Sequence, residues 1–122
     1  PTGIMLPAVG QGAVGVQCRG DDVKTTSLLA PLDHVSTHAR IIAERAANAY
    51  LGGGCHLPIG AFAEIEGEQL HLRGLVGRPD GSEILFASAK GLVSEAEAVG
   101  HTLADDLLGQ GAKALLQEFA NA

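Results

Sequence analysis

Residues 59–90 read IGAFAEIEGEQLHLRGLVGRPDGSEILFASAK, and this stretch decides the fold. Apolar side chains occupy every second position at residues 59–66 and 70–76, and a third β-like run follows at 83–90. Such alternation is typical of a strand with one buried face. Gly67 separates the first two runs, and Asp80-Gly81, a strong hairpin signal, separates the last two. The stretch therefore predicts three antiparallel strands joined by short turns.

A long helix is predicted before these strands. Asp33 stands where an N-cap is expected, and the helix should run to about Leu51, where a run of glycines begins. Apolar residues at steps of three or four predict its buried face, namely Val35, Ala39, Ile42, Ala43, Ala46 and Tyr50. A shorter helix is predicted over residues 22–30, stopped near Pro31, and a strand over residues 12–18.

Two further helices are predicted after the strands. Ser94 and Glu97 have the spacing of a capping box, which marks a helix start. Apolar residues from Ala112 to Phe119 recur at helical spacing and predict the last helix. The order of elements predicts an α+β fold, in which helices pack on one face of a three-stranded antiparallel sheet and the short strand at 12–18 precedes it.

Composition excludes several classes of protein. The chain has 122 residues, 46% of them hydrophobic and 18% charged, which is the composition of an ordinary globular domain. No run approaches 18 apolar residues, so a membrane span is excluded. The formal charge of −6, the scattered arginines and an aromatic content of 3% argue against nucleic-acid binding. Two cysteines are too few for a disulfide scaffold, and we expect a cytoplasmic protein.

Two short motifs lack the context that their usual function requires. Residues 10–15, GQGAVG, match the dinucleotide-binding pattern GxGxxG, but that motif needs a strand before it and a helix after it. Here Pro7 precedes the motif and the predicted strand follows it. His34 and His38 stand four residues apart on one helix, yet no third ligand is evident and no metal site is predicted.

The two cysteines differ in their surroundings. Cys18 falls within the predicted strand, where a free cysteine is usually a small buried hydrophobe. Cys55 follows three glycines beyond the end of the long helix, so we expect it on a pliable loop from which it can reach outward. A thiol redox pair is disfavoured because the two cysteines form no CxxC motif. Spacing alone leaves both a structural and a functional role open for Cys55.

Three longer stretches together resemble one enzyme family. They are residues 6–15, LPAVGQGAVG, residues 43–46, AERA, and residues 53–60, GGCHLPIG. In this order they resemble porphobilinogen deaminase, also called hydroxymethylbilane synthase, and the resemblance continues through residues 75–77 to the end of the chain. Gly52 departs from the family, which often has glutamate there, but leaves the following Gly-Gly-Cys motif intact.

The resemblance implies a C-terminal part of a three-domain enzyme. We expect residues 1–19 to be a return segment from the first two domains, and residues 20–122 to be the C-terminal cofactor-attachment domain. The third domain of the family is a three-stranded antiparallel sheet with helices on one face, in agreement with the strand pattern above. The catalytic aspartate of the family lies in the first two domains, so no catalytic residue is expected here and the chain alone should be inactive.

The resemblance also implies a chemistry and a site. The family's enzyme is a transferase that joins four porphobilinogen units with loss of ammonia and releases 1-hydroxymethylbilane, in haem biosynthesis. The growing chain is held on a dipyrromethane cofactor, which a thioether attaches to the cysteine of a Gly-Gly-Cys motif, here Gly53, Gly54 and Cys55. Gln11 and Gly12 match a segment beside the cleft and are expected to contact the carboxylates of the cofactor.

The partners follow from the same resemblance. We expect porphobilinogen, the growing polypyrrole and the two preceding domains as partners, and no nucleic acid or membrane. The family is monomeric, but the exposed strand at residues 12–18 should either fold back on the domain or pair two copies. An alternative from a different class is a non-catalytic α+β module that binds a small ligand or another subunit. Only the hypothesis that the chain is part of this enzyme requires a pyrrole bound through Cys55.

Overall fold

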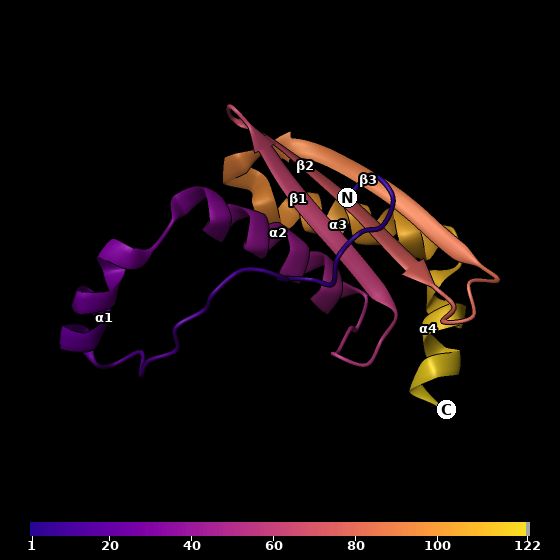
Figure 1. Cartoon of the computed structure of the whole chain (residues 1–122), viewed down its shortest axis with the longest axis horizontal. Coiled ribbons are helices and arrows are strands. Elements are labelled where there is room, and N and C mark those ends of the chain that lie inside the picture. The colour runs from indigo at the N-terminus through magenta and orange to yellow at the C-terminus, as the bar shows by residue number, and fades with distance from the viewer. Residues whose placement is uncertain (122) are drawn as a thin grey trace.

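The computed structural model describes residues 1–121, and its centre is one antiparallel sheet in the order β1–β2–β3 (Figure 1). Its strands are β1 (Ile59–Glu66), β2 (Gln69–Gly77) and β3 (Ile84–Leu92). Leu72 of β2 lies opposite Ala63 of β1 and Ala89 of β3, which sets the register. Gly67 and Gly81 occupy the turns at positive φ, where a residue without Cβ is favoured. The predicted meander is confirmed.

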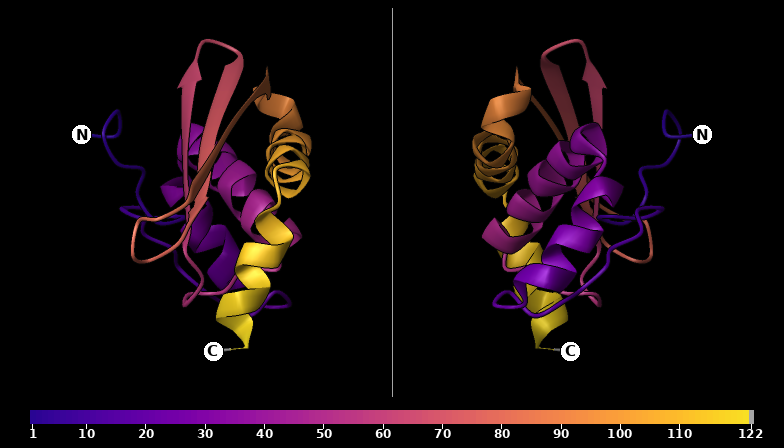
Figure 2. Two further views of the ribbon diagram at one scale, coloured as in Figure 1. Left: turned by 90° about the vertical axis from the view of Figure 1, so that its right-hand side faces the viewer. Right: turned by 90° about the vertical axis from the view of Figure 1, so that its left-hand side faces the viewer.

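Within residues 1–121 the structure has four α-helices, and the first of them lies away from the sheet (Figure 1). They are α1 (Val23–Leu29), α2 (Val35–Tyr50), α3 (Ala96–Gly109) and α4 (Ala112–Ala120), with short 3-10 turns at Ala30–Leu32 and Val93–Glu95. Figure 2 shows α2 and α3 on one side of the strands and the N-terminal segment on the other. The α+β fold with helices on one sheet face is therefore confirmed. Among the described residues no helix is long and apolar enough to cross a membrane.

The core lies between the sheet and these helices. Alternate residues of β2 face the helices and are fully buried, while their neighbours along the strand are only partly buried. The largest fully buried side chains are Leu70, Leu72, Val76, Leu103 and Leu107. Helix and sheet approach closely at Gly74, where an added Cβ would lie 2.5 Å from a methyl carbon of Leu103. The alternation in the sequence thus defines which face of the sheet is covered.

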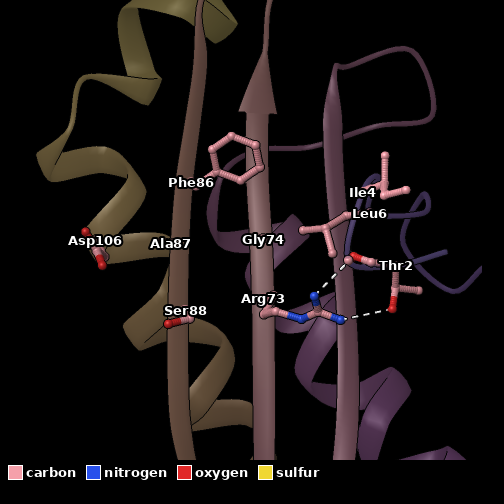
Figure 3. A pocket seen from close by; sticks show the side chains of 10 residues that line it. Thr2, Ile4, Leu6, Arg73, Gly74, Phe86, Ala87, Ser88 and Asp106 are labelled. Carbon is pink, nitrogen blue, oxygen red and sulfur yellow. Dashed lines mark hydrogen bonds between the residues drawn. The ribbon is translucent and has the colours of Figure 1, made fainter.

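The N-terminal segment crosses the outer, helix-free face of the sheet. The Arg73 guanidinium donates to the backbone oxygen of Thr2 at 3.1 Å and to its hydroxyl at 3.2 Å (Figure 3). Further along, the Ala61 N–H on the edge of β1 donates to the Pro7 oxygen at 3.1 Å. Ala8 then forms an isolated antiparallel bridge with Gly60. Residues 2–8 therefore lie against the sheet without forming a fourth strand.

The strand predicted at residues 12–18 is wrong. This segment has no regular secondary structure, and Val14 is 94% exposed. A strand needs the N–H and C=O groups of a neighbouring strand, and within residues 1–121 none lies beside it. Cys18, predicted to be buried in that strand, is consequently exposed, with its Sγ 3.8 Å from the Thr26 hydroxyl.

The starts predicted for α2 and α3 differ slightly from the observed helix starts. The N-cap of α2 is His34, without a side-chain hydrogen bond, and the Asp33 carboxylate instead contacts His38 Nδ1 at 2.8 Å. The N-cap of α3 is Glu95, because Ser94 is taken up in a 3-10 turn and no capping box forms. Each observed N-cap therefore lies one residue after the predicted one.

The buried face of α2 is narrower than predicted. Only Ala43, Glu44 and Ala47 are buried along this helix, whereas Val35 and Tyr50 are 75% and 48% exposed. Figure 1 shows the start of α2 beyond the strands, where no sheet lies beneath it. Of the six residues predicted for this face only Ala43 is buried, and Ile42 is 40% exposed, so the apolar spacing located the buried face only in part.

Candidate functional site

The loop that carries Cys55 begins at the end of α2. Leu51 caps the helix and is buried, with its N–H donating to the Ala47 oxygen at 3.1 Å. Gly52 then takes a φ of +73°, the left-handed conformation that commonly ends a helix and favours glycine. The chain leaves the helix in a defined direction at this residue.

Position 53 requires glycine because the loop approaches α2 closely there, and not because of its backbone φ angle. Its N–H donates to the Asn48 backbone oxygen at 2.8 Å, so the loop folds back against the last turn of α2. A Cβ on Gly53 would lie 2.9 Å from that same oxygen and nearer still to the Asn48 side chain. Only a residue without a side chain fits this approach.

Cys55 is exposed in the following turn. The Leu57 N–H closes the turn on the Gly54 oxygen at 3.1 Å, and the Gly77 N–H donates to the Pro58 oxygen at 3.1 Å, which ties the loop's exit to β2. The thiol is therefore displayed to solvent from a loop that is anchored at both ends. A thiol presented in this way can act as a nucleophile.

Residues 8–13 form a compact turn at the same end of the sheet. The Gln11 N–H donates to the Ala8 oxygen and the Ala13 N–H to the Gly10 oxygen, each at 3.2 Å. Gly10 and Gly12 have φ of +71° and +86°, so both stand in the left-handed region. Gln11 is exposed, and its side-chain oxygen accepts the Ala8 N–H at 3.2 Å. The predicted site residues Gln11 and Gly12 thus belong to one well-defined turn.

The fold brings this turn near the start of β1, the strand into which the Cys55 loop leads. The bridge between Ala8 and Gly60 joins the two regions, although 52 positions separate these residues in the chain. Within residues 1–121 no hydrogen bond joins Gln11 or Gly12 directly to Cys55. The structure therefore places the predicted site residues at one end of the sheet without joining them to each other.

Glu44 is a residue that the sequence reasoning missed. Its side chain lies between α2 and β1 and accepts the N–H groups of Gly10 and Ala63. The signal that could have found it is its position on the helix between Ala43 and Ala47, within the buried stripe. Its neighbour Arg45 is exposed and forms no ion pair among the described residues.

Tyr50 fixes the end of α2, just before the loop, to α3. Its ring lies 4.9 Å from the His101 ring, centroid to centroid. A hydrogen bond to Asp105, together with the charge of that carboxylate, raises the pKa of Tyr50 above its ordinary value. The base of the Cys55 loop is therefore held on the helical layer.

The other candidate sites gain no support. His34 Nδ1 lies 2.7 Å from the Thr37 hydroxyl, and the described residues contain no group of three possible metal ligands. The GxGxxG motif is followed by irregular chain and not by a helix, so it lacks the geometry for a pyrophosphate. A groove of about 520 Å³ on the outer sheet face, lined by Arg73 and Phe86, contains none of the predicted site residues (Figure 3).

A comparison with protein-family models agrees with this architecture. Residues 38–109 match the model described as porphobilinogen deaminase, C-terminal domain. The matched part includes most of α2, the Cys55 loop, all three strands and α3. It covers more than half of the 122 residues. The chain therefore belongs to the porphobilinogen deaminase family, the hydroxymethylbilane synthases of tetrapyrrole biosynthesis, and contains their C-terminal domain.

Proposed function

We propose that this chain is the cofactor-bearing part of a hydroxymethylbilane synthase and that Cys55 is the anchor. The observation that carries the proposal is an exposed thiol on a glycine loop that is tied to α2 and β2 by backbone hydrogen bonds. The family uses a dipyrromethane cofactor and binds porphobilinogen. An anchor for a lengthening pyrrole chain has to be accessible to solvent and firmly connected to the domain, and Cys55 satisfies both conditions.

The residues present fit the group. A thioether needs a soft nucleophile, and Cys55 supplies a free thiol in the matched domain. When bound, the dipyrromethane provides the primer to which further pyrrole units are added. The residues around Cys55 serve to present the thiol, since Gly52 and Gly53 direct the loop and Pro58 ties it to the sheet.

Gln11 and Gly12 complete the proposed binding site. Each pyrrole carries carboxylates, which need N–H donors or cations. Within residues 1–121 the Gly12 N–H donates to no protein acceptor, and the Gln11 side chain uses only its oxygen in the turn. The Gly12 N–H and the Gln11 side-chain amide are thus both available to a carboxylate of the cofactor.

Catalysis requires more than this chain. The substrate and its products are polycarboxylates, whereas the chain has a formal charge of −6. We therefore propose that residues 20–122 act as the attachment domain, that residues 1–19 connect it to two further domains, and that those domains supply the cations and the catalytic acid. The chain alone should not turn over porphobilinogen. We place it in the cytoplasm, in keeping with its two free cysteines.

Pairing of two copies through the exposed segment at residues 12–18 stays a prediction. In the structure, Pro7 and Glu44 accept outward N–H groups of the β1 edge, those of Ala61 and Ala63. A second copy could pair there only after these bonds are released. Gel filtration with light scattering tests the prediction, since a dimer would support pairing through residues 12–18 and a monomer would contradict it.

An intact mass under denaturing conditions tests the anchor. Protein that also contains the two proposed preceding domains, isolated from cells that make porphobilinogen, should carry the added mass of two pyrrole units and give a colour with Ehrlich's aldehyde. Cys55→Ala should abolish both signals because it removes the thioether sulfur. Cys18→Ala, which removes the other exposed thiol, is the matched control and should retain both.

Two results would contradict the proposal. An added mass that persists in Cys55→Ala would place the cofactor elsewhere. An unmodified mass in the chain produced alone would mean that the domain was never primed, whereas an unmodified mass in protein that also has the two preceding domains would favour the alternative, a non-catalytic ligand-binding or subunit-interaction module.

A further inference from the structure

A buried carboxylate stands between the two parts of the proposed site. Glu44 is 5% exposed, and it is the one charged residue that the described part of the chain buries in its core. It lies on α2 between Ala43 and Ala47, which are 0% and 1% exposed. Burying a carboxylate is costly unless hydrogen bonds replace its lost water. The hydrogen-bond partners of Glu44 therefore indicate the structural role of its carboxylate.

Both carboxylate oxygens accept backbone N–H groups from distant parts of the chain. Oε2 accepts the Gly10 N–H at 2.8 Å, and Oε1 accepts the Ala63 N–H at 2.9 Å. No Lys, Arg or His side chain of the described residues forms an ion pair with Glu44. Hydrogen bonds to a charged acceptor are roughly twice as strong as neutral ones. The carboxylate thus joins three segments, the residue 8–13 turn, α2 and β1.

The two hydrogen bonds to Glu44 come from segments that differ in how firmly other contacts fix them. Ala63 belongs to β1, whose position the sheet already fixes by pairing with β2. Gly10 belongs to the turn, whose start is held on β1 by the bridge between Ala8 and Gly60 and whose own backbone bonds are internal. Beyond Ala8, the hydrogen bond from Gly10 to Glu44 holds the turn against α2 and β1.

We propose that Glu44 is a positioning residue for Gln11 and Gly12. Its carboxylate sets where these two residues stand relative to β1, and therefore relative to the Cys55 loop that leads into β1. The inference rests on the proposed function, in which Gln11 and Gly12 contact the dipyrromethane. Glu44 itself touches neither Cys55 nor the turn's exposed side chains, so its effect on the cofactor is indirect.

Glu44→Gln is the substitution that isolates this role. The amide keeps the size of the side chain but has one acceptor oxygen, so it can accept only one of the two N–H groups. Its NH₂ group would face the other N–H, donor against donor. Ala63 is held by the sheet, and the bond to Gly10 should be the one that is lost.

Hydrogen exchange followed by NMR measures the loss directly. In Glu44→Gln the Gly10 amide should exchange roughly tenfold faster or more, as expected for a lost bond to a charged group. Leu72, in the centre of the sheet, reports any general loss of stability. Arg78→Ala, which breaks contacts to Glu83 and to Glu118 of α4 and no hydrogen bond to the turn, is the destabilised control and should leave the ratio of Gly10 to Leu72 exchange unchanged.

The intact mass supplies the second measurement. In protein that also contains the two preceding domains and comes from porphobilinogen-making cells, Glu44→Gln should lower the fraction of chains that carry the pyrrole mass several-fold, while Arg78→Ala should not. Glu44→Asp keeps both oxygens on a shorter side chain and should restore part of that fraction.

The outcomes separate the two proposals. Faster Gly10 exchange with a full pyrrole fraction in Glu44→Gln would overturn the positioning role and leave the proposed function standing. Gly10 exchange that rises only as much as that of Leu72 would overturn the inference outright. A wild-type protein that has the two preceding domains but no pyrrole mass would defeat the proposed function, and the Gly10 exchange would still decide whether Glu44 holds the turn.

Discussion

Neighbouring glycines around Cys55 have different structural tasks. The sequence suggested one pliable run, but Gly52 provides a left-handed helix end and Gly53 permits a close contact with Asn48. The N–H groups of Gly52 and Gly53 donate to backbone oxygens at 3.0 and 2.8 Å. The start of the loop is therefore more constrained than its composition implied, because glycine allows tight packing as well as freedom of motion.

Gly53→Ala tests the close contact. The added Cβ would lie 2.9 Å from the Asn48 oxygen, so the end of α2 or the loop must shift. We expect a loss of about 1–3 kcal/mol in the free energy of unfolding, the usual cost of an overpacked site. Urea denaturation measures it. Gly3→Ala, where nothing lies within 4 Å of the new Cβ, is the control. Equal midpoints for the two variants would show that the loop yields freely.

Among the elements, α2 and α3 pack unusually closely. An added Cβ at Gly100 of α3 would lie 2.5 Å from the Ala43 oxygen and 2.7 Å from the Ala46 Cβ. Small residues on both helices allow this approach. It matters for the site because α2 carries Glu44 on its buried face and the Cys55 loop at its end.

Gly100→Ala should therefore separate the two helices. We expect a loss of about 1–3 kcal/mol in stability, despite the better helix propensity of alanine, because backbone atoms cannot make room. Gly109→Ala lies on the same helix, where nothing lies within 4 Å of the new Cβ, and should cost much less. Thermal unfolding compares the two variants. A Gly100→Ala protein as stable as Gly109→Ala would contradict the packing argument.

The local pattern of apolar residues predicted some secondary-structure elements better than others. The strands of the meander were predicted to within about two residues, because each is paired with its neighbour in sequence. The segment at residues 12–18 has the same alternation of apolar residues but lacks a partner, so it forms no strand. The alternation of apolar residues shows which face a strand would bury, but it does not show whether a neighbouring strand is present to pair with it.

Across the whole molecule, Arg78 connects the β2–β3 turn to the C-terminal helix. Its guanidinium contacts Glu83 at 3.2 Å and pairs with the Glu118 carboxylate of α4. The hydrogen bond and charge of Arg78 lower the pKa of Glu118 below its ordinary value. Because the folded-state pKa is depressed, this contact stabilises the fold above the ordinary carboxyl range, and the contribution is lost as the pH falls through the folded pKa.

Arg78→Ala should accordingly return the pKa of Glu118 towards 4.5, its ordinary value. A carbon-detected NMR titration of the Glu118 carboxyl group measures the change. Lys113→Ala, on the same helix and without an ion pair to Glu118 among the described residues, should leave the titration where it is in the wild type. A Glu118 titration unmoved by Arg78→Ala would show that the contact does not persist in solution.

The fold class, the two hairpin turns and the Cys55 loop could be read along the chain, because their signals are local. Alternation over eight residues, an Asp-Gly pair and a glycine run after a helix each act on neighbouring residues. The family resemblance rests on the same kind of contiguous information, and the match over residues 38–109 agrees with it.

The role of Glu44 could not be read in this way. Its partners Gly10 and Ala63 lie 34 and 19 positions away, and neither spacing has a periodic meaning. They meet because α2 packs across β1 at one particular place, which depends on the close approach of Gly100 to α2 and on the sheet register. A hydrogen bond between distant segments follows from packing in three dimensions, and packing is a property of the assembled core.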